Sequence, residues 1–527
     1  MKRDFTVFFT ADIHGRDRAS ARIFTIYKRE REKAEKEGRT CLFFDSGDSA
    51  DRSLDYCGLT KCRAYTHVLN AMTYDAQTVG NDIGLVYGLP PLLESLKRIE
   101  YPVLGANFRD GENPPIPGIT ERLIFTYGRV KIGVFGMTNR WNNAYERVMG
   151  LRFPEEVSCA AEQVRRLKEE GAQIVIFLSH MGIAEEIEIL FETQEIDLII
   201  GGHSHTSTPA GLLNNRGVLI HHCGQYGENL GRVDFSIDDE TGQIISREAR
   251  LYPVDETIEE APEILLAIQS AREEADIIGK KHLGITPVDL DLDYWNQCAL
   301  GNFAADALSR FTKTDLAIVA GGNLTAPIKR GEIKMRDLSR ACFSTVNPCV
   351  STMTGQAISV TLERGLDEDL NRYYHHGLRG APIGIPQVSG ISVTADLSRI
   401  KGKRIAQIEV NGEPLDKDKK YRVAHTIWKA INSWGTFRKR IIVWRKSERK
   451  FLWWMFLSAI WKVHLNLTGP KRIGGTSSER GVATLFLINQ LCYPLQNFYR
   501  RRYEQFQVFQ TFVYTHNIAR HRNYVCM

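Results

Sequence analysis

The chain has 527 residues, of which 43% are hydrophobic and 25% charged, so its composition is that of an ordinary globular protein. This excludes a collagen-like, coiled-coil or wholly disordered chain, and at roughly 150 residues per domain the length predicts about two to four domains. The net charge of +5 arises entirely from Phe437–Met527, which carries +13, whereas residues 1–436 carry −8.

The first 250 residues alternate between strand-like and helix-like segments. Strands are expected at Phe5–Thr10, Cys41–Asp45, Tyr101–Leu104, Val130–Gly136, Ile174–Leu178 and Leu198–Ile200, with one more short strand that ends near Val79. Helices are expected at Arg18–Gly38, Lys61–Met72, Leu89–Ile99 and Pro154–Glu170. Three further strands follow without helices between them, at Val218–His222, Arg232–Ile237 and Gln243–Tyr252. The pattern predicts an α/β sheet that closes with an antiparallel section.

A second set of elements follows a long charged helix at Glu259–Lys281, which reads as a linker. Helices are expected at Ala299–Phe311 and Gly355–Leu366, and strands at Asp315–Val319, Val388–Thr394, Ile405–Val410 and Tyr421–Ala424. We therefore expect one domain over residues 1–255, a linker over 256–284, a smaller α/β domain over 285–436, and a basic, aromatic tail over 437–527. The tail is interpreted as unrelated or out-of-frame sequence, as a basic module, or as a diverged end of the preceding domain.

Polar groups follow five predicted strands at the point where each strand ends. They are Asp12-Ile13-His14, Gly47-Asp48, Gly80-Asn81-Asp82, His180, and His203-Ser204-His205. In an α/β sheet the carboxyl ends of the strands face one crevice, where ligands bind. We therefore expect all five groups, at the strand ends of one sheet, to converge on one metal site.

The ligand types indicate which metals such a site would take. Carboxylate and amide oxygens mixed with imidazole nitrogens suit Mn, Fe or Zn better than Ca. None of the five groups contains a cysteine, which argues against a structural zinc site. Several ligands from separate loops favour two metals. Two cations about 3.5–4 Å apart can activate a water and clamp both ends of an in-line displacement at phosphorus.

These motifs resemble the calcineurin-like metallophosphoesterase pattern of Asp-x-His, Gly-Asp, Gly-Asn-His, a lone His and Gly-His-x-His, in the same order over residues 5–206. The following residues resemble the bacterial 5′-nucleotidase family, through Gly301–Ala307, Gly321–Ile328 and Gln387–Gly390. The resemblance implies a four-layer β-sandwich flanked by helices, followed by a smaller α/β domain.

The resemblance also implies roles for individual residues. Asp12, His14 and His205 would hold one divalent cation, Asn81, His180 and His203 would hold the other, and Asp48 would bridge both. The cations would be Mn, Zn, Fe or Co. The residues implied at the substrate are Gly321, Gly322, Asn323, Thr325 and Phe343. The implied activity is a 5′-nucleotidase-like hydrolysis of nucleotides, with a metal-activated hydroxide as nucleophile and no phosphoenzyme.

The chain departs from the family pattern at the residues nearest the leaving group and the substrate. Asp82 stands where the family has histidine, and it is either a leaving-group acid beside the catalytic Asn81 or a polar residue that supports the ligands. Thr325 replaces an arginine of the substrate loop, and a hydroxyl cannot replace a bidentate charged fork. Phe343 is either one ring of the family's base clamp or a core residue, and no loop for the second ring follows Tyr421–Ala424.

These departures keep other functions open. The alternatives are a nucleotide-sugar pyrophosphatase, a cyclic-nucleotide phosphodiesterase, or a catalytically weakened nucleotide-binding protein. No nucleic-acid fold signature accompanies the basic tail, so we expect no nucleic-acid partner; the oligomeric state stays open. The longest apolar run, Phe451–Trp461, is shorter than the roughly 20 residues of a membrane span, and Met1–Thr10 does not resemble an export signal, so we expect a cytoplasmic protein.

Overall fold

A computed structural model of the chain describes residues 2–83, 85–111, 116–140, 145–146, 150–214, 216–342, 348–373 and 381–426, and the backbone of 441–443. Its N-terminal part contains two β-sheets. The first is seven-stranded, in the order β15-β14-β1-β2-β3-β4-β6. Its strands are β1 (Lys2–Thr10), β2 (Thr40–Asp45), β3 (Ala76–Thr78), β4 (Val103–Leu104), β6 (Ile119–Thr120), β14 (Asn229–Asp238) and β15 (Ile244–Pro253).

In this first sheet β1, β2, β3, β4 and β6 run parallel, and β14 and β15 add an antiparallel edge. The second sheet is six-stranded, in the order β12-β13-β11-β10-β8-β7. Its strands are β7 (Arg122–Tyr127), β8 (Val130–Thr138), β10 (Ile174–His180), β11 (Leu198–Gly201), β12 (Leu212–Leu213) and β13 (Leu219–His222). Strands β8, β10, β11 and β13 are parallel, with β7 and β12 antiparallel at the two edges.

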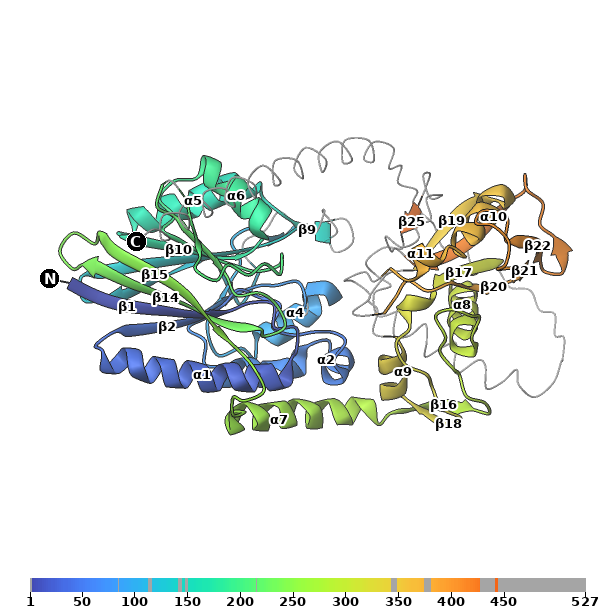
Figure 1. The fold of residues 1–527 in the computed structure, drawn as a ribbon, viewed down its shortest axis with the longest axis horizontal. Helices are drawn as coiled ribbons and strands as arrows, with labels where there is room; N and C mark the ends of the chain where they lie inside the picture. The colour runs from blue at the N-terminus through green and yellow to red at the C-terminus, as the bar shows by residue number, and fades with distance from the viewer. Residues whose placement is uncertain are drawn as a thin grey trace, which may run out of the picture.

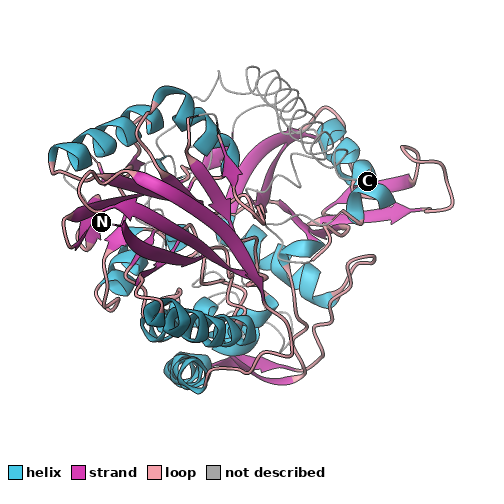
Figure 2. Cartoon of the chain, turned by 60° about the vertical axis from the view of Figure 1, so that its left-hand side comes forward, coloured by secondary structure: helices cyan, strands magenta, loops and turns pink. Residues whose placement is uncertain are grey.

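The two sheets pack face to face because their strands alternate in the direction of their side chains. Phe5, Val7 and Phe9 of β1 point into the layer between the sheets, whereas Phe8 packs on the opposite face against helices. Figure 2 shows these strands enclosed by helices on both sides. The expected four-layer sandwich is therefore confirmed. The expectation that all five polar groups end strands of one sheet is wrong, since β1, β2 and β3 belong to one sheet and β10 and β11 to the other.

Helices cover both outer faces. The first sheet is covered by helices that share one apolar cluster with it: α1 (Asp17–Lys36), α2 (Asp55–Thr60), the short η1 (Arg63–Tyr65), α3 (Thr66–Ala71), η2 (Leu85–Tyr87), α4 (Leu89–Leu96) and α7 (Pro262–Gly279). The second sheet packs its outer face on α5 (Glu156–Glu169) and α6 (Ile183–Glu192). The expected helix at Lys61–Met72 starts only at Arg63, because Lys61 and Cys62 adopt left-handed backbone conformations.

Helix α7 is more than a connection. It runs beneath α1 and α2 in Figure 1, and its buried residues Ile264, Ile268, Ala271 and Ala275 belong to the same cluster as those helices. It then leads into the C-terminal part, where it contacts α9 (Met335–Ala341). The apolar cluster continues there through Leu300, Leu324 and Leu338. Both parts of the chain thus share one continuous core.

The C-terminal part is built on a five-stranded sheet in the order β20-β17-β24-β19-β25. Its strands are β17 (Leu316–Ala320), β19 (Pro348–Thr354), β20 (Pro386–Ser389), β24 (Lys420–Thr426) and β25 (Ile441–Val443), and its helices are α8 (Ala299–Thr312), α10 (Gly355–Arg364) and α11 (Glu368–Asn371). Two short pairs complete the described strands, β5 (Arg109–Asp110) with β9 (Leu151–Arg152) and β16 (His282–Thr286) with β18 (Gly331–Lys334), together with a three-stranded sheet in which β22 (Ile405–Val410) lies between β21 (Ile391–Ala395) and β23 (Glu413–Pro414).

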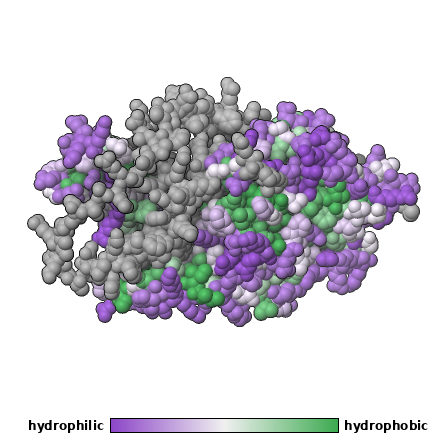
Figure 3. Space-filling view, turned by 180° about the vertical axis from the view of Figure 1, so that it is seen from behind, coloured by the Kyte–Doolittle hydropathy of each residue, from purple (hydrophilic) through white to green (hydrophobic). Residues whose placement is uncertain are grey.

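Three expectations for this part need comment. The single strand expected at Val388–Thr394 is two strands in two sheets, because Gly390 adopts a φ of 70° between them. The tail that begins at Phe437 supplies β25, which pairs antiparallel with β19. Its remaining residues lie outside the described ones. Within the described residues no helix is long and apolar enough to cross a membrane, and the face in Figure 3 mixes hydrophilic surface with small apolar areas.

Candidate metal centre

The polar groups predicted from the sequence meet where strands of the two sheets end. Asp12, His14, Asp48, His203 and His205 all have positive φ values, between 47° and 71°. Left-handed backbone is uncommon for residues other than glycine, although Asp, Asn and His adopt it more readily than most. The tight loops turn the side chains of these residues back toward one point, which an extended continuation of each strand would not do.

The loops are held against each other by backbone contacts. The N–H of Asp12 donates to the carbonyl of Gly47, and the N–H of His14 donates to that of Asp48, each over 2.9 Å. A Cβ at Gly80 would lie 2.2 Å from the nitrogen of Asp48, so only glycine allows the β2 and β3 loops to approach this closely. This close approach explains the glycine that precedes the polar residues in the third motif.

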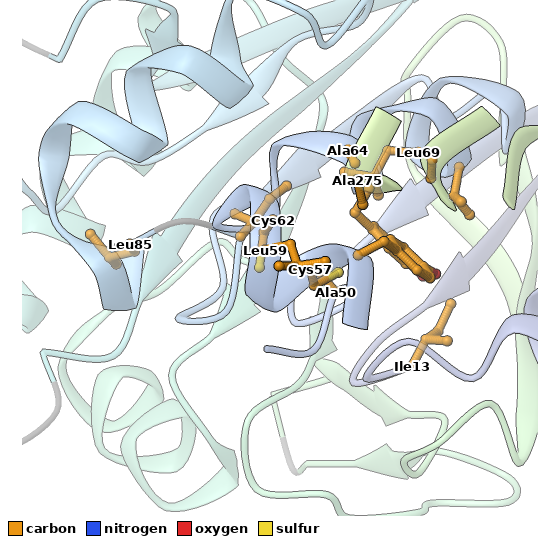
Figure 4. Packing of buried hydrophobic residues seen from close by; sticks show 14 of the residues in the cluster. Ile13, Ala50, Cys57, Leu59, Cys62, Ala64, Leu69, Leu85 and Ala275 are labelled. Atoms are coloured by element: carbon orange, nitrogen blue, oxygen red, sulfur yellow. The ribbon is translucent and has the colours of Figure 1, made fainter. Parts of the chain in front are cut away.

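Between the site residues, apolar side chains anchor the same loops in the core. Ile13 lies between Asp12 and His14, and Ala50 follows Asp48 by two residues; both are buried. Figure 4 shows Ala50 near Cys57, Leu59 and Cys62, with Ile13 on the other side of the cluster. Cys57 and Cys62 form no disulfide. The loops are therefore anchored in the apolar core through Ile13 and Ala50. Their polar side chains point away from that core, toward the metal cluster.

Asp12, His14 and His205 form one group of potential ligands. The Nε2 atoms of His14 and His205 face each other over 3.0 Å, and Asp12 Oδ1 lies 3.8 Å and 3.6 Å from them. Asp12 Oδ1 is buried and has no hydrogen-bond partner among the described residues. A buried carboxylate oxygen without a donor, beside two facing ring nitrogens, fits a cation between them.

A second group forms around Asp48. Its Oδ2 lies 3.3 Å from His180 Nε2 and 4.0 Å from His14 Nε2, so this carboxylate stands between the two groups. His180 Nε2 lies 3.2 Å from Asn81 Oδ1, and its Nδ1 lies 2.7 Å from the carbonyl of Ser46, which fixes the ring. The ring of His203 packs edge-on against His180, and its backbone N–H donates to Asp12 Oδ2 over 2.8 Å. All seven predicted ligands lie in this one cluster.

Burial and close charges shift the pKa values in the cluster. Burial raises the pKa of Asp12 to about 7. Burial also opposes the ionisation of Asp48, but His180 and His14 outweigh it and hold the pKa of that carboxyl far below its usual range. Asp48 likewise overcomes the effect of burial on His180 and raises its pKa to about 9. Burial, assisted by His180, lowers the pKa of His203 to about 3. Without a cation, protons on groups such as His180 and Asp12 reduce the repulsion between the clustered side chains. A bound cation would displace these protons.

Asp82 does not lie with the metal-facing atoms of the first group but behind them. It is fully buried, and its Oδ2 lies 3.2 Å from His14 Nδ1, the ring nitrogen turned away from His205. Its other oxygen accepts from Arg52 Nη1 over 3.5 Å. His14, Asp48 and Asp82 also offer ligand atoms within 4.8 Å of one another. Asp82 is therefore placed to orient the His14 ring.

The predicted substrate residues lie in the C-terminal part. Gly321, Gly322 and Asn323 form the short helix η4 (Gly321–Asn323), and the amide nitrogen of Asn323 donates to Ala320. Asn323 Oδ1 is buried without a partner among the described residues. The hydroxyl of Thr325 donates to the carbonyl of Arg340 over 2.6 Å. Phe343, expected as a clamp or core residue, lies outside the described residues.

Sequence reasoning missed two side chains that border the centre. Arg52 contacts Asp82, and its position four residues after Asp48 in the same loop could have marked it. Tyr226 packs against the rings of His14 and His205, with the guanidinium of Arg16 over its own ring at 4.5 Å. No sequence motif marks Tyr226, because it reaches the centre from the β13–β14 connection. His221 and His222, on the neighbouring strand β13, are buried, and His222 pairs with Glu186 over 2.7 Å.

A sandwich of two sheets with acidic and imidazole side chains at adjoining strand ends defines the class, and comparison with known families agrees. Residues 5–207 match the calcineurin-like phosphoesterase family, so the N-terminal part is a metallophosphoesterase. Residues 278–437 match the 5′-nucleotidase C-terminal domain. The chain belongs to the 5′-nucleotidase family of metallophosphoesterases and is a hydrolase of phosphate esters.

Individual relatives span most of the chain. It is 25% identical over 427 residues to the uncharacterized metallophosphoesterase YunD of Bacillus subtilis, covering 80% of this chain and 92% of that one. It is 27% identical over 436 residues to the 5′-nucleotidase of Bos taurus, covering 72% and 73%. The structure of a 5′-nucleotidase precursor from Thermus thermophilus is similar with a TM-score of 0.54 and 20% identity, covering 87% of this chain and 96% of that one. The last likeness bears on the fold alone.

Proposed function

We propose that this protein is a 5′-nucleotidase-like phosphomonoesterase that removes phosphate from a nucleotide at a centre of two divalent cations. The observation that carries the proposal is the position of Asp48, whose carboxylate stands between His180 on one side and His14 on the other. Two groups of ligands that share one central carboxylate suit a dinuclear centre better than a single ion.

The donor set supports this assignment. We propose that Asp12, His14 and His205 hold one cation, that Asn81, His180 and His203 hold the other, and that Asp48 bridges them. The partnerless Asp12 Oδ1 and the facing nitrogens of His14 and His205 are the atoms that such a cation would satisfy. Mixed oxygen and imidazole donors suit Mn, Zn, Fe or Co. When bound, the cations would supply an activated water and offset negative charge on the phosphoryl oxygens.

The chain's own residues have three tasks in this proposal. Asp48 and the imidazoles fix the geometry of the centre, and the carbonyl of Ser46 holds the His180 ring in one orientation. Asn81 places its amide at the edge of the centre, where it can contact a phosphoryl oxygen. Asp82 accepts a hydrogen bond from Nδ1 of the His14 ring. This contact keeps the Nε2 atom of His14 directed at Asp12 and His205. We propose that Asp82 is a positioning residue, not the leaving-group acid.

The substrate assignment rests on the C-terminal part and on the relatives. We propose that the domain over residues 285–436, joined through the linker at 256–284 to the phosphoesterase domain at 1–255, binds the nucleotide through Gly321, Gly322, Asn323 and Thr325. Relatives named apyrase and 5′-nucleotidase match 74% and 72% of this chain, so the similarity extends beyond the phosphoesterase part. They favour a nucleotide over the sugar-nucleotide and cyclic-nucleotide alternatives, and hydrolysis over binding alone.

The test is a substrate panel with the metal as a controlled variable. The protein is stripped with a chelator, reloaded with Mn²⁺, Zn²⁺, Co²⁺ or Fe²⁺, and assayed with nucleoside monophosphates, a nucleotide sugar, a cyclic nucleotide and an aryl phosphate. We expect metal-dependent release of phosphate from the monophosphates and two cations bound per chain. Asp48→Asn should abolish turnover, whereas Asp197→Asn, which changes a partly buried carboxylate that accepts from the Val175 N–H, should not. Preferred cleavage of the nucleotide sugar or cyclic nucleotide would refute the proposal.

A further inference from the structure

Helix α2 of the phosphoesterase part packs directly against helix α9 of the C-terminal part (Figure 1). A Cβ at Gly58 of α2 would lie 2.8 Å from the hydroxyl oxygen of Ser339 on α9, so the lack of a side chain at Gly58 allows this close approach. Both helices also contact α7, which leads from the first part of the chain into the second. The three helices therefore hold the two parts against each other at one place.

Charged side chains reinforce the contact between these helices. Asp55 begins α2, and its Oδ2 lies 2.6 Å from Arg336 Nε and 3.2 Å from Arg340 Nη2, both on α9. Arg336 also pairs with Asp276 of α7. The side chains of Asp55 and Arg336 are 25% and 24% exposed, so water screens this network less than it screens an isolated surface pair. Asp55 thus connects two arginines of α9 to the phosphoesterase part.

The phosphoesterase end of this network reaches the metal centre. Asp48 lies in the connection between β2 and α2, and Leu54, the residue before Asp55, packs on the loop of the first two proposed ligands. A Cβ at Gly15 would lie 2.1 Å from Leu54 Cδ1, and the N–H of Gly15 donates to the carbonyl of Ser49 over 2.7 Å. A displacement of α2 would therefore move the loop that carries the proposed bridging carboxylate.

The C-terminal end of the network reaches the proposed substrate loop, Gly321–Thr325. The carbonyl of Arg340 accepts from the Thr325 hydroxyl over 2.6 Å, and the carbonyl of Ala341 accepts from the Thr325 N–H over 2.9 Å. Arg340 therefore contacts α2 with its side chain and the substrate loop with its backbone. A continuous series of contacts runs from the metal centre through Asp55 and Arg340 to Thr325.

We propose that Asp55 and Arg340 are positioning residues that hold the loop Gly321–Thr325 at the spacing from the metal centre that a nucleotide requires. The inference rests on the proposed function and deepens it. A nucleotide must reach both sites at once, so the affinity gained by joining its phosphate to its nucleoside depends on the distance between the sites. An aryl phosphate uses the metal centre alone and gains nothing from that spacing.

The first test compares the kinetics of Asp55→Asn, Arg340→Ala and the double variant with those of Arg272→Ala. Arg272 of α7 is 63% exposed, against 57% for Arg340, and its ion pair of 2.7 Å leads to Asp17 of α1 instead of α9. We expect kcat/KM for adenosine monophosphate to fall about fivefold in Arg340→Ala, mainly through KM, which is the upper range for one exposed ion pair. Arg340→Lys should recover most of this loss.

The double variant should be no worse than Asp55→Asn, because both side chains act through one contact. In all of these variants, activity on an aryl phosphate should stay within about twofold of the wild type, since the metal ligands are unchanged. Equal losses on both substrates, or the same loss in Arg272→Ala, would overturn the inference, because they would indicate a general effect on folding or on the metal centre.

The second test requires no turnover and measures binding to the Mn²⁺-loaded protein by calorimetry. The probes are inorganic phosphate, adenosine, and the methylene phosphonate analogue of adenosine monophosphate, which cannot be hydrolysed at the ester position. We expect Arg340→Ala to bind the analogue about fivefold more weakly and to bind the two fragments as the wild type does. An analogue affinity that does not change, or that changes only as much as a fragment affinity, overturns the inference. A wild type that binds the analogue but cleaves no monophosphate refutes the proposed function alone, and the comparison of variants still decides the inference.

Discussion

The neighbours of Asp82 decide whether its carboxylate orients a metal-binding histidine or donates a proton to the leaving group. At the position where the resembled family carries an imidazole, this chain places a buried acid that accepts from the His14 ring. Hydrogen bonds of this kind hold the tautomer and direction of metal-binding histidines, and their loss typically lowers metal affinity by about 10–100-fold. A leaving-group acid would instead have to face the departing oxygen with a proton available.

Asp82→Asn separates these two roles. The variant keeps the shape but removes the charge that orients His14, so we expect Mn²⁺ affinity to fall by about 10–100-fold. The ratio of activity on a nucleoside monophosphate to activity on an aryl phosphate should not change at saturating Mn²⁺. For the same reason Asp82→His should not raise turnover on the monophosphate. A loss confined to the poorer leaving group, or a gain with histidine, would restore the acid role.

Metal binding should release protons in a way that depends on pH. Without metal, the pKa of His180 is about 9 and that of Asp12 about 7, whereas metal ligands must be deprotonated. Below pH 7 both groups must lose a proton on binding; between about 7 and 9 only His180 must; above 9 neither does. We expect Mn²⁺ affinity to rise with pH and to level off near 9.

Calorimetry in buffers of different ionisation enthalpy measures this proton release directly. His180→Gln should remove one released proton at pH 8. His221→Gln is the matched control, because burial lowers the pKa of His221 to about 4 and the ring is already neutral at that pH. Equal proton release by the wild type and His180→Gln would show that His180 is not the group displaced.

At the scale of elements, helix α7 is tied to the phosphoesterase part by a charged network as well as by apolar packing. Glu274 accepts from Arg98, Arg63 and His67, which lie on or after the helices that cover the first sheet. Hydrogen bonding to Arg98 outweighs partial burial and holds the pKa of Glu274 at about 2. The folded value lies below the ordinary 4.5, so the ionised carboxylate contributes stability above pH 4.5 that is lost as the pH falls toward 2.

Glu274→Gln should therefore destabilise the protein at pH 7 by about 1 kcal/mol, the scale of a partly exposed charge network. The difference from the wild type should persist down to about pH 5 and shrink between 4.5 and 2. Urea unfolding across that pH range provides the measurement. Glu273→Gln is the control, since the exposed Glu273 accepts only from Gln269 among the described hydrogen bonds. A difference that does not depend on pH would mean that the glutamate acts through packing.

The sequence indicates the residues of the candidate site more completely than it indicates the helices and sheets around them. Asp12, Asp48 and His180 were identifiable because short motifs follow strands whose apolar runs are unambiguous. Helix α2 (Asp55–Thr60) was not expected, because its six residues include Gly58 and its stability comes from packing against α7 and α9. The division into two sheets was not apparent either, because no local pattern tells which strands pair. Arg52 was missed because its significance lies in a contact with a different loop.

At the scale of the whole molecule, the shared apolar cluster makes the two parts interdependent, and the proposed metal ligands all come from the first of them. The described tail residues Ile441–Val443 pair only with β19, at the edge of the C-terminal sheet. The seven proposed ligands all lie before residue 206. The charge reversal at Phe437 also coincides with the end of the match to the 5′-nucleotidase C-terminal domain.

A chain cut after Gly435 should therefore keep Mn²⁺ binding and hydrolysis of an aryl phosphate. A second chain, cut after Val443, retains β25 and is the control for the edge strand. We expect equal metal affinity in both and a lower melting temperature in the shorter chain, because β19 loses its neighbour. Loss of metal binding in the shorter chain alone would show that the edge strand supports the centre at a distance.

The left-handed residues of the centre have a consequence for how this sequence can evolve. A non-glycine residue in that conformation typically costs of the order of 1 kcal/mol, and Asp12, His14, Asp48, His203 and His205 all adopt it. Selection for a durable fold alone would favour glycine at each of these positions. A descendant freed from the reaction would thus gain robustness by losing its ligands one by one, while the sandwich beneath survived. Such a descendant would keep the architecture of a phosphoesterase, with glycines at the strand ends where this chain has its proposed metal ligands.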